Sequence, residues 1–369
     1  MSLVMKVELQ EQETRSEPAM PRTAILKMYD RRFSPSLRRG YSPYYDEDNE
    51  SAWREYVCQG RAPALFSFMR EKARREEEGE LVETDSETDA SSVEEENKNV
   101  PRTPAETFTK NGKREGIMQW KALDLWHCET RAYAKLAHLQ GHCIPRLLAV
   151  VCLGVPSTPS DLLSSEKGSN SEYFIIGGIL VEYIEGFSLS DLGVQPISSV
   201  PRERWHGIIQ RAVDAARDIN DSGVINYDCQ PRNVMVDRQT LEPKHIDFAQ
   251  CRFAEDMGWK EFGELKYSMG NPRAMGSIMV AKLQKTGHFQ GPEIRCGSQR
   301  DWGWFGSALV RLRFLAWKGW TATARWRVGV GFGAGFGVLA WVMWRFANPK
   351  LRLHLYKGLR GALGGTYDH

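Results

Sequence analysis

Three polar residues stand in a pattern that suits the binding of a divalent cation and a phosphate. Asp228 and Asn233 are separated by four residues, and Asp247 follows in the second of two short strands expected at 234–237 and 244–248. Carboxylate and amide oxygens are the ligands that Mg²⁺ prefers, and two neighbouring loops can bring them together. Phosphoryl transfer from ATP needs such a site, a cation that grips the phosphates and a group that orients the acceptor hydroxyl.

A long helix is expected immediately before this loop. It begins at Pro201 and ends at Gly223, because glycine commonly follows the last turn of a helix. The apolar residues of one face recur at helical spacing and are Trp205, Ile208, Ile209, Ala212, Val213, Ala216 and Ile219.

A second helix is expected over 118–140, and it carries an acidic residue on its apolar side. The apolar positions of this stripe are 122, 125, 126, 132, 133, 136 and 139. Glu129 falls inside the same stripe. A carboxylate on a buried face costs free energy unless a cation or hydrogen-bond donors meet it, so we expect a specific partner for Glu129.

Apolar runs predict a small β-sheet in the N-terminal half. Residues 24–29 form one expected strand, which carries Lys27, and residues 4–9 form another. Residues 144–154 and 172–184 are two further strands, and the polar loop between them suits a hairpin.

These elements, in this order, resemble the protein-kinase-like superfamily. NYDCQPRN (226–233) is similar to the catalytic-loop pattern H-R-D-x-x-x-x-N, and DFA (247–249) is similar to D-F-G. AILK (24–27) resembles V-A-I-K, ETRAYAKL (129–136) resembles the helix segment that carries the glutamate partner of that lysine, and ILVEYIEGFSL (179–189) resembles the hinge between two lobes. The resemblance covers roughly residues 20–290, and five elements in order are far more specific than any one alone.

The resemblance implies a role for each matched residue near the phosphates. Asp228 would be the catalytic aspartate, with Arg232 beside it as a phosphate cation. Asn233 and Asp247 would hold Mg²⁺, and Lys27 would grip the phosphates of ATP.

The resemblance also implies roles on the nucleotide side. Glu129 would pair with Lys27, which accounts for a carboxylate in an apolar stripe. Glu182 and Ile184 would offer backbone groups to adenine.

The implied fold is α+β and two-lobed, with an incomplete N-lobe sheet and a helical C-lobe. The expected parts are a partial N-lobe (1–70), an acidic insertion (71–110), the rest of the N-lobe with the hinge (111–185), the C-lobe (186–290) and a basic tail (291–369). More narrowly, ILKMYDRRF followed by HLQGHCIPRLL resembles fungal kinase-like proteins that carry a long insertion after the lysine strand.

The insertion is predicted to be disordered after a short helix at 51–69. Residues 71–98 hold twelve Asp or Glu and four Lys or Arg, with few large apolar side chains. Such a segment cannot bury enough apolar surface to offset the entropy of ordering.

Several positions depart from the family pattern. No Gly-x-Gly-x-x-Gly precedes Lys27, and the usual His and Arg of the catalytic loop are Asn226 and Tyr227. Gln230 and Ala249 replace a common lysine and the glycine of D-F-G. Three interpretations therefore stay open: an active phosphotransferase that uses a hydroxyl acceptor, a pseudokinase scaffold, and a small-molecule kinase.

The tail differs in composition from the rest of the chain. The last 69 residues hold seven of the twelve Trp and twelve of the 33 Gly. Residues 328–344 are uncharged, near the lower length limit for a membrane-spanning helix, and contain GxxxG motifs such as Gly331/Gly335 and Gly333/Gly337. A membrane anchor, a buried C-lobe helix and the product of a translated intron or shifted reading frame are all consistent with this stretch.

The overall composition limits the class of protein. A net charge of +2 does not favour nucleic-acid binding, and seven cysteines without a CxxC pair fit neither a disulfide framework nor a zinc ribbon. The first residues lack the apolar run of a signal peptide. We therefore expect an intracellular, cytoplasmic protein, membrane-anchored only if 328–344 spans a bilayer, with ATP and a protein or small-molecule hydroxyl acceptor as partners.

Overall fold

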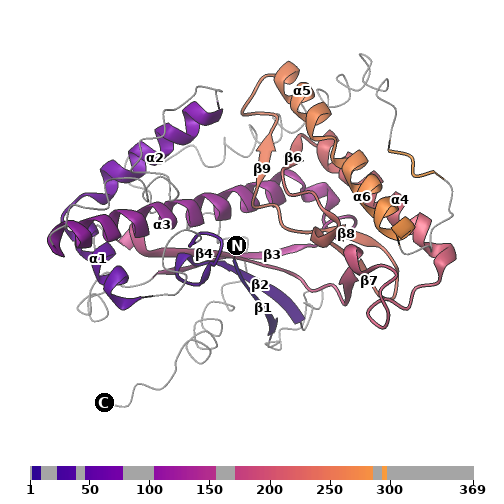
Figure 1. Cartoon of the computed structure of the whole chain (residues 1–369), viewed down its shortest axis with the longest axis horizontal. Coiled ribbons are helices and arrows are strands. Elements are labelled where there is room, and N and C mark those ends of the chain that lie inside the picture. The colour runs from indigo at the N-terminus through magenta and orange to yellow at the C-terminus, as the bar shows by residue number, and fades with distance from the viewer. Residues whose placement is uncertain are drawn as a thin grey trace, which may run out of the picture. The chain divides into compact units, whose positions relative to one another are not determined.

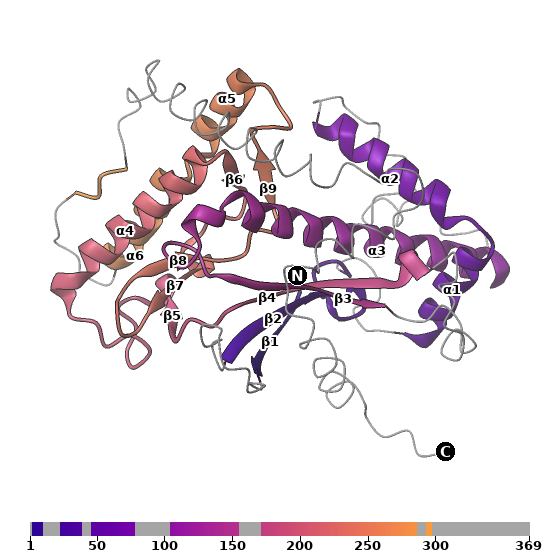
Figure 2. The same cartoon turned by 180° about the vertical axis from the view of Figure 1, so that it is seen from behind.

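A computed structural model describes residues 2–9, 23–38, 46–77, 104–154, 171–285 and 293–296 (Figure 1, and Figure 2 from behind). Helices and small sheets are mixed along the chain, so the α+β prediction is confirmed. The chain divides into two compact units. The first comprises Met1–Val7, Ile25–His127 and Val151–Leu180, and the second comprises Glu8–Ala24, Cys128–Val150 and Val181–His369.

A four-stranded sheet lies mainly in the first unit, in the order β1-β2-β4-β3. Its strands are β1 (Leu3–Glu8), β2 (Thr23–Tyr29), β3 (Leu147–Gly154) and β4 (Ile175–Glu182). All four predicted strands are present, and β3 and β4 are neighbours, as the hairpin prediction requires. β4 starts later than predicted because a 3-10 helix, η5 (Ser171–Phe174), precedes it.

The described helices of the first unit are α1 (Glu47–Cys58), α2 (Ala62–Glu77) and the longer α3 (Pro104–Lys135), whose last residues belong to the second unit. α1 and α2 lie beside the N-terminal half of α3 in both views (Figures 1 and 2). Gly116 allows this packing, since a Cβ there would meet the side chains of Trp53 and Leu65 at 2.5–2.6 Å. Trp53 is fully buried within the resulting cluster.

The predicted helix and disordered insertion need correction. Instead of one helix at 51–69 there are two, separated by Gly60 with φ +70°. α2 continues through 71–77, and α3 already begins at Pro104, so both ends of the segment 71–110 are helical. Along α2 the carboxylate of Glu71 accepts hydrogen bonds from Arg74 and Arg75 at 2.7–3.0 Å. These charged residues, which led to the prediction of a disordered segment, therefore form ion pairs three and four residues apart on a helix. Residues 78–103 lie outside the described part.

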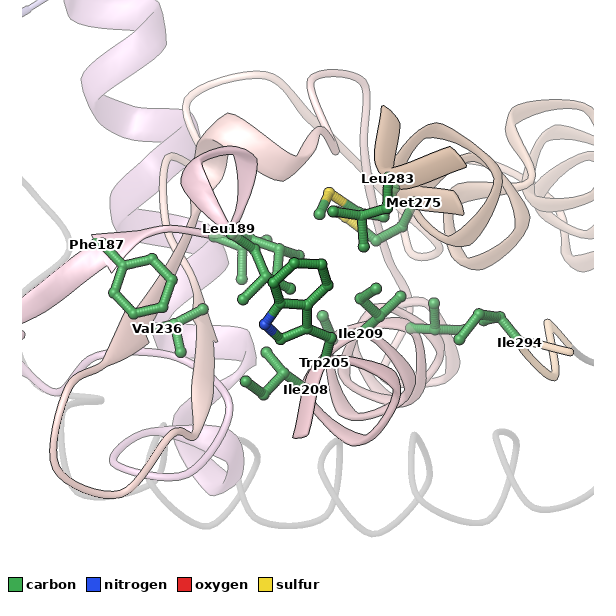
Figure 3. Packing of buried hydrophobic residues seen from close by; sticks show 14 residues of the cluster. Phe187, Leu189, Trp205, Ile208, Ile209, Val236, Met275, Leu283 and Ile294 are labelled. Atoms are coloured by element: carbon green, nitrogen blue, oxygen red, sulfur yellow. The ribbon is translucent and has the colours of Figure 1, made fainter. Parts of the chain in front are cut away.

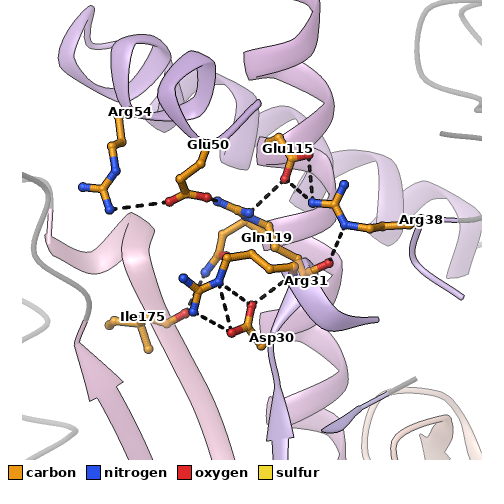
Figure 4. A network of polar contacts seen from close by, with 9 residues as sticks. Asp30, Arg31, Arg38, Glu50, Arg54, Glu115, Gln119 and Ile175 are labelled. Carbon is orange, nitrogen blue, oxygen red and sulfur yellow. Dashed lines mark hydrogen bonds and ion pairs between the residues drawn. The ribbon is translucent and has the colours of Figure 1, made fainter. Parts of the chain in front are cut away.

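A buried ionic network holds the loop after β2 against α1 and α3 (Figure 4). Arg31 donates to Glu115 at 2.8 Å and to Glu50 at 2.5 Å. Arg38 donates to both carboxylate oxygens of Glu115 at 2.9 Å and to the carbonyl of Arg31 at 3.1 Å. All four side chains are at least nine-tenths buried. From the sequence alone, Arg31 and Arg38 belong to a basic loop, and no acidic partner could be assigned to them.

Replacing Glu115 tests this network. Glu115→Gln leaves two buried guanidinium groups without their shared counter-charge, so we expect the free energy of unfolding to fall by about 3 kcal/mol. Chemical denaturation of the full chain measures the change. Glu71→Gln, which removes a half-exposed carboxylate paired with two arginines on α2, is the matched control and should unfold like wild type. Equal effects of the two substitutions would contradict the role of the network.

Among the described residues, the second unit contains α4 (Arg202–Asp221), α5 (Trp259–Met269) and α6 (Asn271–Lys285), together with the end of α3. Its short strands are β5 (Gly186–Ser188), β6 (Val224–Asn226), β7 (Val234–Asp237), β8 (Pro243–His245) and β9 (Cys251–Phe253). β5, β7 and β8 form one antiparallel sheet and β6 pairs antiparallel with β9. Short 3-10 helices are η1 (Arg31–Phe33), in the first unit, and η3 (Ala137–Leu139), η6 (Leu189–Asp191) and η7 (Pro231–Asn233).

The core of the second unit lies between α4 and α6 (Figure 3). Trp205 packs with Leu189 and Met275 at its centre. All seven apolar residues predicted for one face of α4 are buried, so the helical prediction is confirmed. Gly223 follows the helix with φ +81°, a conformation that glycine adopts without strain.

None of the described helices is long and apolar enough to cross a membrane. The uncharged segment 328–344, for which a membrane anchor was one interpretation, lies outside the described residues.

Buried His245 on β8 gives the second unit a dependence on pH. Its Nε2 lies 2.9 Å from the carbonyl oxygen of Ala212, and the ring is almost inaccessible. Burial lowers the pKa of His245 from 6.5 to about 4, although the hydrogen bond to Ala212 opposes this shift. Between these two pH values the unfolded chain binds more protons than the folded chain.

We therefore expect the free energy of unfolding to fall by up to about 3 kcal/mol as the pH drops from 6.5 to 4 and to level off below 4. Denaturation of wild type and His245→Gln at several pH values measures this, and the variant should show a shallower decline. The exposed His142, replaced by Gln, serves as the control. A decline as steep in His245→Gln as in wild type would assign the effect to other groups.

Candidate functional site

The loop between β6 and β7 brings three of the predicted residues into direct contact. Asn233 donates through Nδ2 to Oδ2 of Asp228 and to its backbone carbonyl, both at 2.9 Å. Arg232 donates to Oδ1 of Asp228 at 2.5 Å. The carboxylate is thus oriented at both oxygens. Because the amide nitrogen of Asn233 points to Asp228, its Oδ1 remains as the side-chain oxygen for a cation.

Asn226 connects this loop to the one that carries Asp247. Its Oδ1 accepts from the backbone N–H of Asp228, and its Nδ2 donates to the backbone carbonyl of Asp247, each at 2.9 Å. On α6, Asn271 donates to the carbonyl of Asn226 at 3.0 Å. One buried amide therefore holds both acidic loops at a set separation.

Asn226 is the functional residue that sequence reasoning missed, since it was noted only as a departure from the family pattern. The available signal was an amide at the end of the apolar strand Val224–Asn226, all of which is buried. A buried amide must have hydrogen-bond partners, and here the partners belong to the two predicted aspartates.

Asp247 has φ +65°, which places its backbone in the left-handed region. This conformation costs L-residues roughly 1–2 kcal/mol, and aspartate bears that cost more often than most residue types do. Leu241 is the other described non-glycine residue with positive φ. A strained residue persists where its neighbours hold it in place.

Glu129 is buried and meets a hydrogen-bond donor, as its place in an apolar stripe predicted. Its Oε1 accepts from the backbone N–H of Phe248 at 3.1 Å, directly after Asp247. The Phe248 ring is fully buried and packs edge-on against Tyr133, with ring centroids 5.6 Å apart. Glu129 therefore anchors the segment that follows Asp247.

Lys27 lies in the first unit, on β2, whereas the residues described above lie in the second. Its ammonium is 5.3 Å from the ring centroid of Tyr29, a cation–π distance, and the side chain is largely buried. The pairing of Lys27 with Glu129 stays a prediction.

Glu182 uses most of its polar groups within the protein. Its carboxylate accepts from Lys244 at 3.1 Å and from the backbone N–H of Arg146 at 3.0 Å. Its own N–H donates to the carbonyl of Arg146 at 2.9 Å. The backbone carbonyl is then the group of Glu182 suited to a ligand. Ile184 follows two residues later and is buried. Adenine recognition by these two residues stays a prediction.

The donor set near Asp228 fits Mg²⁺, which prefers hard oxygen ligands and near-octahedral geometry. Asn233 and Asp247 would supply an amide oxygen and a carboxylate. Burial, and then the charge of Asp228, raises the pKa of neighbouring Cys229 to about 12, so its sulfur stays a neutral thiol and not a competing ligand. In the described part of the chain no three or more His, Cys, Asp or Glu side chains gather around one point, so magnesium binding here would rely on phosphate oxygens as well.

Comparison with known proteins supports a kinase-like relationship. No protein-family model matches the chain. Over 138 residues the chain is 27% identical to Probable serine/threonine-protein kinase fnkB of Dictyostelium discoideum. The match covers 36% of this chain and spans only 23% of the length of the Dictyostelium protein.

Substituting Asn226 tests the link between the two loops. Asn226→Asp keeps the shape of the side chain but places an oxygen against the carbonyl of Asp247, so a buried hydrogen bond becomes a repulsion. We expect a loss of about 2 kcal/mol in the free energy of unfolding, measured by chemical denaturation near pH 7. Asn49→Asp, in the first turn of α1 where a carboxylate is tolerated, is the control. A wild-type stability for Asn226→Asp would rule out the bridge.

Proposed function

We propose that the chain is an ATP-dependent phosphotransferase of the protein-kinase-like kind, which transfers the γ-phosphoryl group to a hydroxyl acceptor. In this proposal the first unit is the N-lobe and the second is the C-lobe. The observation that carries the proposal is the bridge of Asn226 between the backbones of Asp228 and Asp247, because it joins the two loops whose aspartates would orient the acceptor and bind the cation. The similarity to a Dictyostelium kinase supports it.

Each candidate site residue near Asp228 then has a defined role. Asp228, held at both oxygens by Arg232 and Asn233, accepts the hydrogen bond of the acceptor hydroxyl through a remaining lone pair. Asn233 and Asp247 hold Mg²⁺, which when bound neutralises charge on the phosphates. Arg232 has a side chain that is 56% exposed, so its guanidinium also reaches solvent, where a transferred phosphoryl group would lie.

The nucleotide side uses the remaining predicted residues. Lys27 grips the phosphates as the cation of β2, and Glu129 serves as its acidic partner. Glu182 accepts a hydrogen bond from adenine through its carbonyl, and Ile184 donates one through its N–H. The carboxylate of Glu182 already accepts hydrogen bonds from Arg146 and Lys244, which supports a role for its backbone and not its side chain in binding adenine.

A second candidate function is a scaffold that binds nucleotide weakly and transfers nothing. Residues 1–26 contain no glycine, so the sequence between β1 and β2 lacks the glycines of the loop that usually covers the phosphates. A small-molecule kinase is a variant of the main proposal, and its distinguishing feature is the acceptor.

Nucleotide binding and transfer together test the proposal. We expect millimolar ATP with Mg²⁺ to raise the Tm of wild type, and Asp247→Asn to lose the magnesium-dependent part of this rise. Asp228→Ala should keep nucleotide binding and lose about 10²–10⁴-fold in transfer rate. Asp214→Asn, a half-exposed aspartate of α4 paired with Arg217, is the control and should behave like wild type.

The outcomes separate the candidates. Stabilisation by Mg-ATP without transfer to any acceptor identifies a scaffold, and transfer to alcohols or amines without transfer to proteins identifies a small-molecule kinase. No stabilisation of wild type, or equal transfer by wild type and Asp228→Ala, would remove the proposal.

A further inference from the structure

The last two turns of α3 hold the segment that follows Asp247 at several points, all within the second unit. β9 lies against these turns (Figures 1 and 2), where Cys251 donates its backbone N–H to Sγ of Cys128 at 3.2 Å. This contact lies four residues after Asp247. It adds to the hydrogen bond from Phe248 to Glu129 described above.

Ion pairs continue the attachment beyond β9. Arg131 donates to both carboxylate oxygens of Asp256 at 2.6 and 2.7 Å, and to Glu255 at 2.9 Å. The same guanidinium lies over the ring of Phe253, 4.0 Å from its centroid. A forked pair of this kind fixes direction as well as distance.

Lys135 adds a second cation one helical turn further along α3. Its ammonium is bonded to Glu255, and its side chain is only 8% exposed. The stem of Lys135 crosses Gly223, where a Cβ would meet its Cε at 3.0 Å. Burial opposes ionisation of Glu255, but the hydrogen bond and charge of Lys135, with those of Arg131, keep the pKa of Glu255 below its ordinary value. The pair is therefore ionic at neutral pH.

These contacts bear on Asp247 through its backbone. Its left-handed conformation is strained, and the hydrogen bond of the next residue, Phe248, is lost if the segment moves away from α3. The ion pairs at 255 and 256 oppose that movement, since they attach the far end of the same segment to the same helix. Free energy from the ion pairs thus offsets the strain at Asp247.

We propose that Arg131, with Lys135, is a positioning residue that holds Asp247 in its left-handed conformation for magnesium. This inference rests on the proposed function. Arg131 does not touch the nucleotide or the metal in this proposal; it acts through Asp256, Glu255 and the backbone between them and Asp247.

Hydrogen exchange and magnesium dependence test the role in the full chain. Arg131→Ala removes the forked pair and leaves the oxygen ligands of Asn233 and Asp247 in place. We expect amide exchange across 247–253 to become about tenfold faster. We also expect the Mg²⁺ concentration for half of the ATP-dependent rise in Tm to increase about tenfold, with the effect of ATP alone unchanged.

Arg211→Ala is the matched control. Its side chain is 43% exposed, against 41% for Arg131, and it pairs with Glu242 at 3.1 Å away from the segment 247–256. We expect neither exchange nor magnesium dependence to change in this variant. A change of equal size in Arg211→Ala would overturn the proposal, because it would reflect a general loss of stability.

Charge reversal separates positioning from packing. Arg131→Asp and Asp256→Arg should each raise the Mg²⁺ concentration for half of the rise in Tm. The double variant should recover part of this change, since both side chains are about 40% exposed and the swap restores the pair between positions 131 and 256 but not the pair with Glu255. A double variant no better than the single ones would overturn an ionic origin.

The exchange measurement needs no nucleotide, so two failures are distinguishable. Unchanged exchange in Arg131→Ala overturns the attachment itself, and faster exchange with an unchanged magnesium requirement overturns its positioning role. Wild type that gains no stability from Mg-ATP overturns the proposed function and, with it, this inference.

Discussion

The candidate site depends on one buried amide. Asn226 accepts from the backbone of Asp228 and donates to the backbone of Asp247, so the two acidic loops that connect the β6/β9 pair with the β7/β8 pair share one hydrogen-bonded centre. An amide can do this at any physiological pH, because it carries a fixed donor and a fixed acceptor and does not titrate. Asn271 adds a contact from α6, which connects the amide to the hydrophobic core of the second unit.

The charged side chains in the two halves of α3 are stabilised by different kinds of contact. In the first unit Glu115 is buried with two arginines, an arrangement that is costly to disturb because every member has been removed from water. In the second unit Glu129 meets a backbone N–H, and Arg131 pairs with carboxylates that remain partly exposed. A single helix thus anchors a basic loop and an acidic segment through different kinds of contact.

Local patterns predicted much of this fold. The apolar face of α4, its end at Gly223 and the strands β2, β3 and β7 follow from periodicities that depend on neighbouring residues alone. The contact of Asp228 with Asn233 also follows, because four intervening residues form one tight loop. The sequence analysis did not predict the helical ends of the expected disordered segment. It counted charges, and a count of charges does not show that Glu71 pairs with Arg74 or that α3 packs closely at Gly116.

The sequence by itself predicted which residues would bind magnesium and phosphate: Asp228, Asn233 and Asp247, with Lys27 on a separate strand. Only the tertiary structure decided how the acidic residues of the second unit are held. Asn226 can bond to both loops because β6 and β9 pair with Asn226 opposite Cys251. Glu129 accepts a hydrogen bond because the backbone N–H of Phe248 lies against α3. These contacts join residues 21 positions apart for Asn226 and Asp247 and 119 positions apart for Glu129 and Phe248, and no local spacing encodes them, because they arise from the packing of whole elements.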